Sequence, residues 1–168
     1  MAIDSSKLRL PDSRDIRDVF GTINTTNGKD NNVIGKHAHG LASVCYDVLN
    51  RIVIDSQLGE AHAYEVDLAV RHLPATQAND LLLLDRGYAS YRWLATCVQQ
   101  QRHFVVRCSA GSFKPARQML TGLGADSRVV DLTSSLGQRL SLARLGLPSV
   151  LRVRFVREVL PNGEFEVL

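Results

Sequence analysis

The sequence predicts a mixed α/β fold, with three strands first and alternating helices and strands after them. Apolar residues follow strand spacing before residue 60 and then switch between helical and strand spacing, giving the order βββαβαβ up to residue 108. Of the 168 residues, 45% are hydrophobic but only 6% aromatic, so aliphatic side chains must fill the core. That composition suits an α/β architecture, with helices on the faces of a mixed sheet, better than an aromatic-rich β-sandwich.

The first strand is predicted at residues 3–10, where the alternating pattern stops at Pro11. A short helix is expected around residues 16–20. The polar run at 24–32 is rich in Asn, Thr, Gly and Asp, which predicts a loop.

Two further strands, at 41–49 and 52–58, are separated only by Asn50 and Arg51 and predict an antiparallel hairpin. With the first strand they form a meander. Asp55 alternates with apolar neighbours and is expected to be a solvated strand residue.

The middle of the chain alternates between the two periods. Helical spacing predicts helices over 60–73, 91–98 and 113–123, and strands are predicted at 81–84 and 103–108. The strand at 81–84 consists of four leucines, which is typical of a central strand buried on both faces.

Beyond residue 127 the pattern changes to short β-like pieces at 128–132, 150–160 and 164–168. Pro161, Asn162 and Gly163 predict a hairpin between the last two. The predicted domains are 1–127, the α/β core, and 128–168, a β-rich region.

Charge is distributed unevenly along the chain, although the net charge is only +3. Residues 1–101 carry a net −2, whereas residues 102–157 contain ten basic residues and two acidic ones, a net +8. The remaining residues add three glutamates. This asymmetry is expected of a protein that holds a polyanion on its basic part, with metal or acid chemistry on the other. Arginines make up most of the cations, which suits phosphate binding and equally fits genomic base composition.

Targeting and redox signals are absent from the sequence. No apolar run is long enough for a membrane span, and the first residues do not have the layout of a signal peptide. A cytoplasmic protein is therefore expected. Cys45, Cys97 and Cys108 are far apart and flanked by apolar residues, so inert core thiols are expected rather than disulfides or metal ligands.

Two aspartates are candidates for chemistry. Asp85 follows the four leucines directly and precedes Gly87, so it lies at the carboxyl end of a strand, where parallel sheets bind ligands; spacing alone favours an acidic turn or capping residue. Asp4 lies inside the first strand, where acids are depleted, so it either faces solvent or serves a site. If a right-handed crossover places strand 81–84 beside the first strand, the two carboxylates become neighbours that require a divalent cation such as Mg²⁺.

Several pieces of the chain carry a resemblance to a known family. They resemble, in the right order, the catalytic domain of DDE transposases of the insertion sequence 4 family. The most specific piece is Asp-Arg-Gly-Tyr after an apolar strand. The matching pieces are residues 2–11, 46–50, 57–59, 81–88 and 104–107.

The resemblance implies a ribonuclease H-like fold and a metal-dependent reaction on DNA. In that family an Asp on the first strand, an Asp at the end of the fourth and a Glu on a later helix bind Mg²⁺, or Mn²⁺ in its place. Asp4 and Asp85 match the first two acids by position and flanking sequence. The resemblance also implies a location in the bacterial cytoplasm, associated with the nucleoid.

The third acid of the family is not matched. Glu158, Glu164 and Glu166 all lie in β-like sequence, without the Tyr, Arg and Lys that accompany the family's Glu. The resemblance therefore predicts that residues 128–168 begin an insertion and that the chain is truncated before the catalytic helix.

The expected function is that of a DNA transposase catalytic-domain fragment, which performs phosphodiester hydrolysis and strand transfer in the complete protein and is inactive alone. The alternative is a non-catalytic remnant that binds DNA or a partner transposase chain. A complete small nuclease would need another acid, and Asp126 and Asp131 are the only acids in the basic segment.

Weaker expectations concern contacts with DNA. Arg86 could touch phosphate or pair with a carboxylate. Two arginines share a face of the strand at 150–160, which could meet the DNA backbone or pair with Glu164 and Glu166. Tyr91 and Trp93 are expected in the core, with base stacking as the minor alternative. The candidate DNA-binding residues are Arg86, Lys114, Arg117, Arg152 and Arg154.

Overall fold

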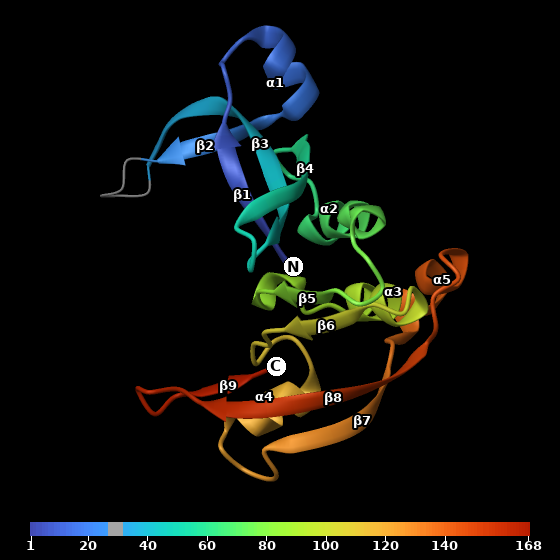
Figure 1. Ribbon diagram of the computed structural model, residues 1–168. Coiled ribbons are helices and arrows are strands. Elements are labelled where there is room, and N and C mark those ends of the chain that lie inside the picture. The colour runs from blue at the N-terminus through green and yellow to red at the C-terminus, as the bar shows by residue number, and fades with distance from the viewer. Residues whose placement is uncertain (27–31) are drawn as a thin grey trace. The chain divides into compact units, whose positions relative to one another are not determined.

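The structure is a computed structural model that describes residues 1–26 and 32–168 (Figure 1). The chain forms two compact units, Met1–Thr76 and Gln77–Leu168. Among the described residues, no helix combines the length and the apolar character needed to cross a membrane. The predicted domain boundary at residue 127 stays a prediction.

The described residues of the first unit form four strands and two α-helices. Its elements are β1 (Ala2–Arg9), α1 (Arg14–Phe20), β2 (Thr22–Thr26), β3 (Val33–Asp47), β4 (Ile52–Glu60), α2 (Glu65–His72) and the 3₁₀ turn η1 (Leu73–Ala75).

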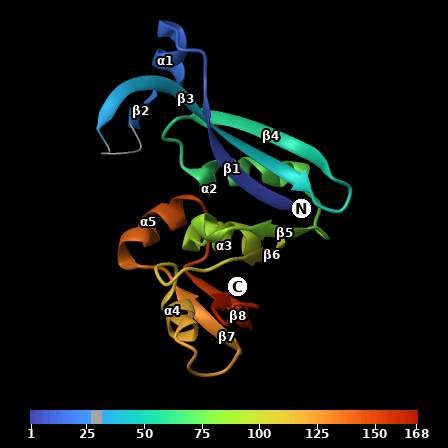
Figure 2. The same cartoon turned by 90° about the vertical axis from the view of Figure 1, so that its left-hand side faces the viewer.

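Strand β3 organises the first unit, because it pairs antiparallel with β1, β2 and β4 (Figures 1 and 2). The predicted meander of β1, β3 and β4 is confirmed. Gly40 allows close packing on β4, since a Cβ there would lie 2.9 Å from a methyl carbon of Leu58 and would displace that side chain. The prediction missed β2 and the first eight residues of β3, because Gly35 and Gly40 and the two histidines between them interrupt the apolar alternation.

Three predicted boundaries in this unit are corrected. The polar run at 24–32 was predicted as a loop, but residues 24–26 belong to β2, and residues 27–31 lie outside the described residues. The hairpin turn spans 48–51, where the Asp47 carboxylate accepts the main-chain N–H groups of Leu49 and Asn50. Helix α2 begins at Glu65 rather than residue 60, because β4 continues to Glu60.

The Asp12 carboxylate links the start of α1 to β3 by hydrogen bonds. It accepts Arg17 Nε–H at 2.7 Å and the main-chain N–H of Ala38 at 3.0 Å. The adjacent Ser13 caps the helix by accepting the N–H of Ile16. The Arg17 hydrogen bond, assisted by that of Ala38, holds the pKa of Asp12 well below its usual range.

We expect this carboxylate to make the first unit sensitive to acid. Because the pKa of Asp12 is lower in the folded state, its contribution to stability is present above the ordinary value of 3.8 and is lost as the pH falls below it. Asp12→Asn should therefore lower the urea midpoint at pH 7 and bring the variant and wild-type midpoints together as the pH falls toward 2. Asp18→Asn, in an exposed pair with Arg14, is the control and should change neither.

The second unit contains five strands and three α-helices. Its elements are β5 (Leu81–Leu84), the 3₁₀ turn η2 (Arg86–Tyr88), α3 (Tyr91–Gln99), β6 (His103–Val106), α4 (Lys114–Leu120), β7 (Ser127–Thr133), α5 (Leu136–Arg144), β8 (Val150–Val159) and β9 (Phe165–Val167).

Strands β5 and β6 form a parallel pair joined through α3, which confirms the predicted strand-helix-strand unit. The prediction that β5 is buried on both faces is wrong. Leu82 and Leu84 are buried, whereas Leu81 and Leu83 are 47% and 38% exposed. Four leucines in a row fit a one-sided strand as well as a two-sided one, since the side chains alternate between faces.

The C-terminal part forms an antiparallel sheet in the order β7-β8-β9. The predicted hairpin between β8 and β9 is confirmed, with Gly163 at φ +82°. Helix α5 was missed because Leu136 and Leu140 are exposed and Leu142 is its one buried residue, so the helix has no apolar stripe. Its start is nevertheless marked by the Ser135 capping box.

Helix α3 supplies much of the core of the second unit. Trp93 is fully buried and Tyr91 nearly so, which confirms the core interpretation and argues against base stacking in this state. Val98 of the same helix is 41% exposed. The expectation of inert thiols holds for Cys97 and Cys108, because burial raises the pKa of Cys97 to about 12 and that of Cys108 to about 11.

Together, the antiparallel strands of the first unit and the parallel pair of the second confirm the predicted mixed α/β class.

Candidate functional site

Asp4 lies in the middle of β1, opposite Val44 of β3, with its side chain exposed. Its neighbour Ile3 is buried, so the strand presents an apolar side chain to the core and the carboxylate to solvent. Among the described residues, the Asp4 carboxylate has no hydrogen-bond or ion-pair partner. It is therefore available to an external cation.

Asp85 occupies the carboxyl end of β5, as predicted. It is the N-terminal flanking residue of η2, but its side chain does not cap that turn. Instead Asp85 Oδ1 lies 3.4 Å from Arg107 Nη1, and both side chains are about half exposed. The parallel register explains this pair, because Leu84 aligns with Val106 and the residues that follow each strand meet at one edge.

Arg107 also contacts Glu166 of β9, through its Nε atom. The guanidinium therefore joins Asp85 and Glu166, two carboxylates that lie far apart in the sequence. The main-chain hydrogen bond from Cys108 N to Val167 O, 2.7 Å long, holds the segment that contains Arg107 beside β9. Sequence reasoning placed Glu166 in a strand, which is confirmed, but had no signal for its link to the β5 edge.

The two predicted metal ligands belong to different units, each of which positions its own aspartate. Carboxylate oxygens are the ligand type that Mg²⁺ and Mn²⁺ prefer. Within residues 1–26 and 32–168 there is no cluster of three or more His, Cys, Asp or Glu side chains arranged to hold a metal ion. Exposed and partly exposed carboxylates fit a divalent cation in donor type, and they leave coordination positions open for other oxygen ligands.

A buried polar chain in the first unit was missed by sequence reasoning. His72, at the end of α2, is fully buried and lies between Asp55 of β4 and Ser43 of β3. Its Nδ1 is 2.7 Å from Asp55 Oδ2, and its Nε2 is 3.0 Å from Ser43 Oγ. Ser43 in turn donates its hydroxyl to the main-chain oxygen of Asp4 at 3.3 Å.

The prediction that Asp55 is simply solvated is therefore wrong. Its side chain is only 25% exposed and forms an ion pair with His72. Hydrogen bonding from the Gln57 side chain, together with His72, lowers the pKa of Asp55. No local pattern could have shown this pairing, because Asp55 and His72 are 17 residues apart and meet only when α2 packs on the sheet.

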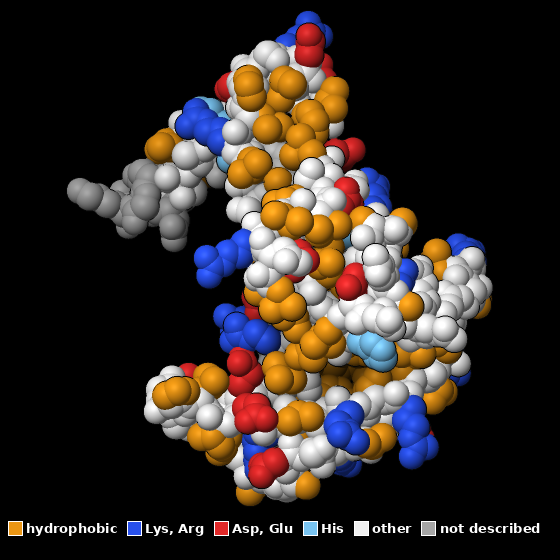
Figure 3. Space-filling model, in the orientation of Figure 1, with side chains coloured by type: hydrophobic (Ala, Val, Ile, Leu, Met, Phe, Trp, Pro, Cys, Tyr) orange, Lys and Arg blue, Asp and Glu red, His pale blue; other side chains and the backbone are white. Residues whose placement is uncertain are grey.

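The candidate DNA-binding residues are all exposed, but they do not share one partner or element. Arg86 and Lys114 have no ion-pair partner among the described residues, and Arg117 Nε donates to Ala110 O. On the visible face, Lys and Arg side chains lie in separate groups (Figure 3). The candidate residues therefore lie on three elements: Arg86 on η2, Lys114 and Arg117 on α4, and Arg152 and Arg154 on β8.

The alternative that Arg152 and Arg154 pair with Glu164 and Glu166 is wrong. The register of β7 and β8 places Asp131 opposite Arg152 and Val129 opposite Arg154. The two glutamates lie farther along, since β9 pairs with the other end of β8 and Glu166 faces Glu158. Contact of the two arginines with DNA stays a prediction.

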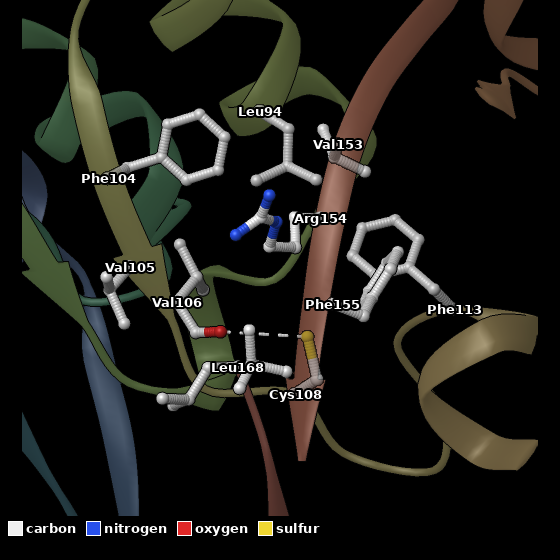
Figure 4. Close-up of a pocket in the computed structure, with 11 residues that line it drawn as sticks. Leu94, Phe104, Val105, Val106, Cys108, Phe113, Val153, Arg154, Phe155 and Leu168 are labelled. Atoms are coloured by element: carbon white, nitrogen blue, oxygen red, sulfur yellow. Dashed lines mark hydrogen bonds between the residues drawn. The ribbon is translucent and has the colours of Figure 1, made fainter. Parts of the chain in front are cut away.

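The Arg154 side chain also lines an apolar cavity of about 280 Å³ in the second unit. In Figure 4 its guanidinium lies among Leu94, Phe104 and Val106, and a hydrogen bond joins the Cys108 thiol to Val106 O. The rest of the lining is apolar, so the cavity matches the hydrophobic core around it and not the chemistry of the two aspartates.

Comparison with known protein families identifies the class of this domain. The family model of the transposase DDE domain matches residues 1–142. The chain therefore belongs to the transposase DDE domain family, and its mixed α/β structure is consistent with the ribonuclease H-like fold of a DDE domain. Neither a curated protein nor a solved structure matched it.

Proposed function

We propose that this chain contributes Asp4 and Asp85, as ligands of Mg²⁺ or Mn²⁺, to the DNA phosphodiester chemistry of a transposase of the insertion sequence 4 family. The reaction would be hydrolysis of a phosphodiester, followed by attack of the released 3′-hydroxyl on target DNA. The observation that carries the proposal is membership of the transposase DDE domain family, together with two exposed aspartates whose flanking sequences resemble those of the family's first two acids.

The role of the two aspartates follows from their chemistry. When bound, a divalent cation lowers the pKa of an attacking water and stabilises charge on the phosphate oxygens. Asp4 would supply its unpartnered carboxylate directly. Asp85 would exchange its partly exposed contact with Arg107 for the cation, and Arg107 would stay beside the phosphate as a positive charge.

We expect each aspartate to be necessary for metal binding. In NMR titrations with Mn²⁺, paramagnetic broadening should appear at the amides around both residues, and Asp4→Asn or Asp85→Asn should weaken it by about tenfold or more, because each variant removes one anionic ligand. Asp18→Asn, an exposed aspartate of α1, is the charge-matched control and should leave the titration unchanged. Equal Mn²⁺ affinity in both site variants and wild type would contradict the proposal.

We further propose that the chain alone does not cleave DNA. This is supported by the described parts of the chain, in which no three His, Cys, Asp or Glu side chains are grouped to hold a metal ion. The test is nicking of a supercoiled plasmid with Mg²⁺ or Mn²⁺, with Asp85→Asn as the control. Nicking that disappears in Asp85→Asn would show that a further ligand is present after all.

A second candidate is a non-catalytic domain that binds DNA or a partner transposase chain. It is favoured by the exposed cations of the basic second unit, including Arg152 and Arg154. Such binding should be sequence-independent and should weaken steeply with salt, since it depends on counterion release from the phosphates. DNA binding that persists in Asp4→Asn and Asp85→Asn without any Mn²⁺ binding in wild type would favour this candidate.

A further inference from the structure

We infer that His72 and Ser43 are positioning residues for Asp4: a buried hydrogen-bond chain from Asp55 through His72 and Ser43 holds the main-chain carbonyl of Asp4 and so fixes the carboxylate that β1 presents. The inference rests on the proposed role of Asp4 as a metal ligand. It assigns a function to residues that the family match does not single out.

The hydrogen bond between Ser43 and Asp4 has one possible direction. The Asp4 main-chain oxygen can only accept, so the Ser43 hydroxyl is the donor in that contact. Ser43 Oγ also lies 3.0 Å from His72 Nε2. Asp55 accepts from Gln57 Nε2 at 2.9 Å and lies 2.7 Å from His72 Nδ1. His72 is therefore hydrogen-bonded through both of its ring nitrogens.

The contact of the Ser43 hydroxyl with the Asp4 carbonyl argues against a hydrolase triad formed by Ser43, His72 and Asp55. In a hydrolase triad the serine donates to a neutral histidine and its oxygen faces substrate. Here Ser43 is fully buried, and its proton is engaged by a main-chain carbonyl. Ser43 cannot act as a nucleophile in this arrangement, but it can hold a strand in place.

The hydrogen-bond chain from Asp55 to Asp4 restrains Asp4 because it connects four elements. His72 ends α2, Asp55 lies in β4, Ser43 in β3 and Asp4 in β1. The three contacts are 2.7, 3.0 and 3.3 Å long, and the two central side chains are fully shielded from water. Buried polar groups that are fully hydrogen-bonded restrict the backbone they contact, since any displacement would leave a group unpaired.

The matched pair of variants for the test is Ser43→Ala and Thr76→Val. Each removes one buried hydroxyl that donates to a main-chain carbonyl in the same unit, but Thr76 donates to Leu73 and not to β1. Urea unfolding of both variants measures the structural cost. NMR hydrogen exchange of the β1 amides and Mn²⁺ broadening around Asp4 then measure the positioning.

Without metal, Ser43→Ala should speed exchange around Asp4 and Thr76→Val should not. With Mn²⁺, Ser43→Ala should weaken Asp4-dependent binding by roughly tenfold, the size typical of residues that orient metal ligands. Adding His72→Gln to Ser43→Ala should cause no further loss, because His72 acts through Ser43.

The failures are distinguishable. Unchanged exchange and unchanged Mn²⁺ affinity in Ser43→Ala, with Mn²⁺ binding that still depends on Asp4, would overturn this inference and leave the proposed function standing. If wild-type protein shows no Asp4-dependent Mn²⁺ binding, the proposed function is overturned. The role of the hydrogen-bond chain in metal binding is then overturned as well.

Discussion

Trp93→Ala is expected to destabilise the second unit by about 4 kcal/mol, the range found when a fully buried tryptophan is removed from a core. Trp93 has no exposed surface, and its helix α3 contacts both β6 and β8. Truncation at this position therefore opens a cavity where three elements meet. Because Trp93 is the one tryptophan of the chain, unfolding should be followed by far-ultraviolet circular dichroism rather than by fluorescence.

Two further variants make the Trp93 prediction specific. Trp93→Phe should cost clearly less than Trp93→Ala, since it keeps a ring and removes an indole Nε1–H that has no hydrogen-bond partner among the described residues. Leu136→Ala, at a leucine of the same unit that is 77% exposed, should change stability by no more than about 0.5 kcal/mol. Similar losses in all three would mean that Trp93 is not the centre of this core.

Asp55→Ala is expected to destabilise the first unit by about 2 kcal/mol, because it leaves His72 Nδ1 buried without its hydrogen-bond partner. The contact is 2.7 Å long, and the His72 side chain is completely shielded from solvent. A ring nitrogen left unpaired in this position must stay desolvated or attract water into the core. Urea unfolding at pH 7, followed by circular dichroism, measures the loss.

The double variant Asp55→Ala/His72→Leu is the decisive comparison. Replacing both partners of a buried hydrogen bond by apolar groups is often nearly neutral, whereas removing one partner is costly. The double variant should therefore be more stable than Asp55→Ala alone. If it is equally or more unstable, the loss comes from packing around α2 and not from the unpaired polar group.

The sequence pattern predicted the environment of Trp93 correctly and that of Asp55 wrongly. Trp93 was placed in the core from its helix, because the local period of 91–98 already assigned that helix a buried face. Asp55 was placed in solvent from its strand alternation, and the structure shows it paired with His72. Local periodicity reports which face of an element is apolar, but not which polar side chains meet across elements.

The candidate site divides in the same way. Asp4 and Asp85 were found from the sequence, because an acid inside a strand and an acid directly after four leucines are both local anomalies. Arg107, Glu166, Ser43 and His72 were not, since each is unremarkable among its own neighbours. Their partners come from strands and helices up to 59 residues away.

By itself, the sequence determined the α/β class, most elements, the β8–β9 hairpin and the two aspartates, because these depend on the alternation of apolar residues, on turn residues and on one short motif. The tertiary structure alone decided the length of β3, the one-sided burial of β5, the Arg107 link between two carboxylates and the chain from Asp55 to Asp4. The physical reason is range: periodicity acts over one turn or one strand, whereas strand register and helix packing bring distant polar groups within hydrogen-bond distance.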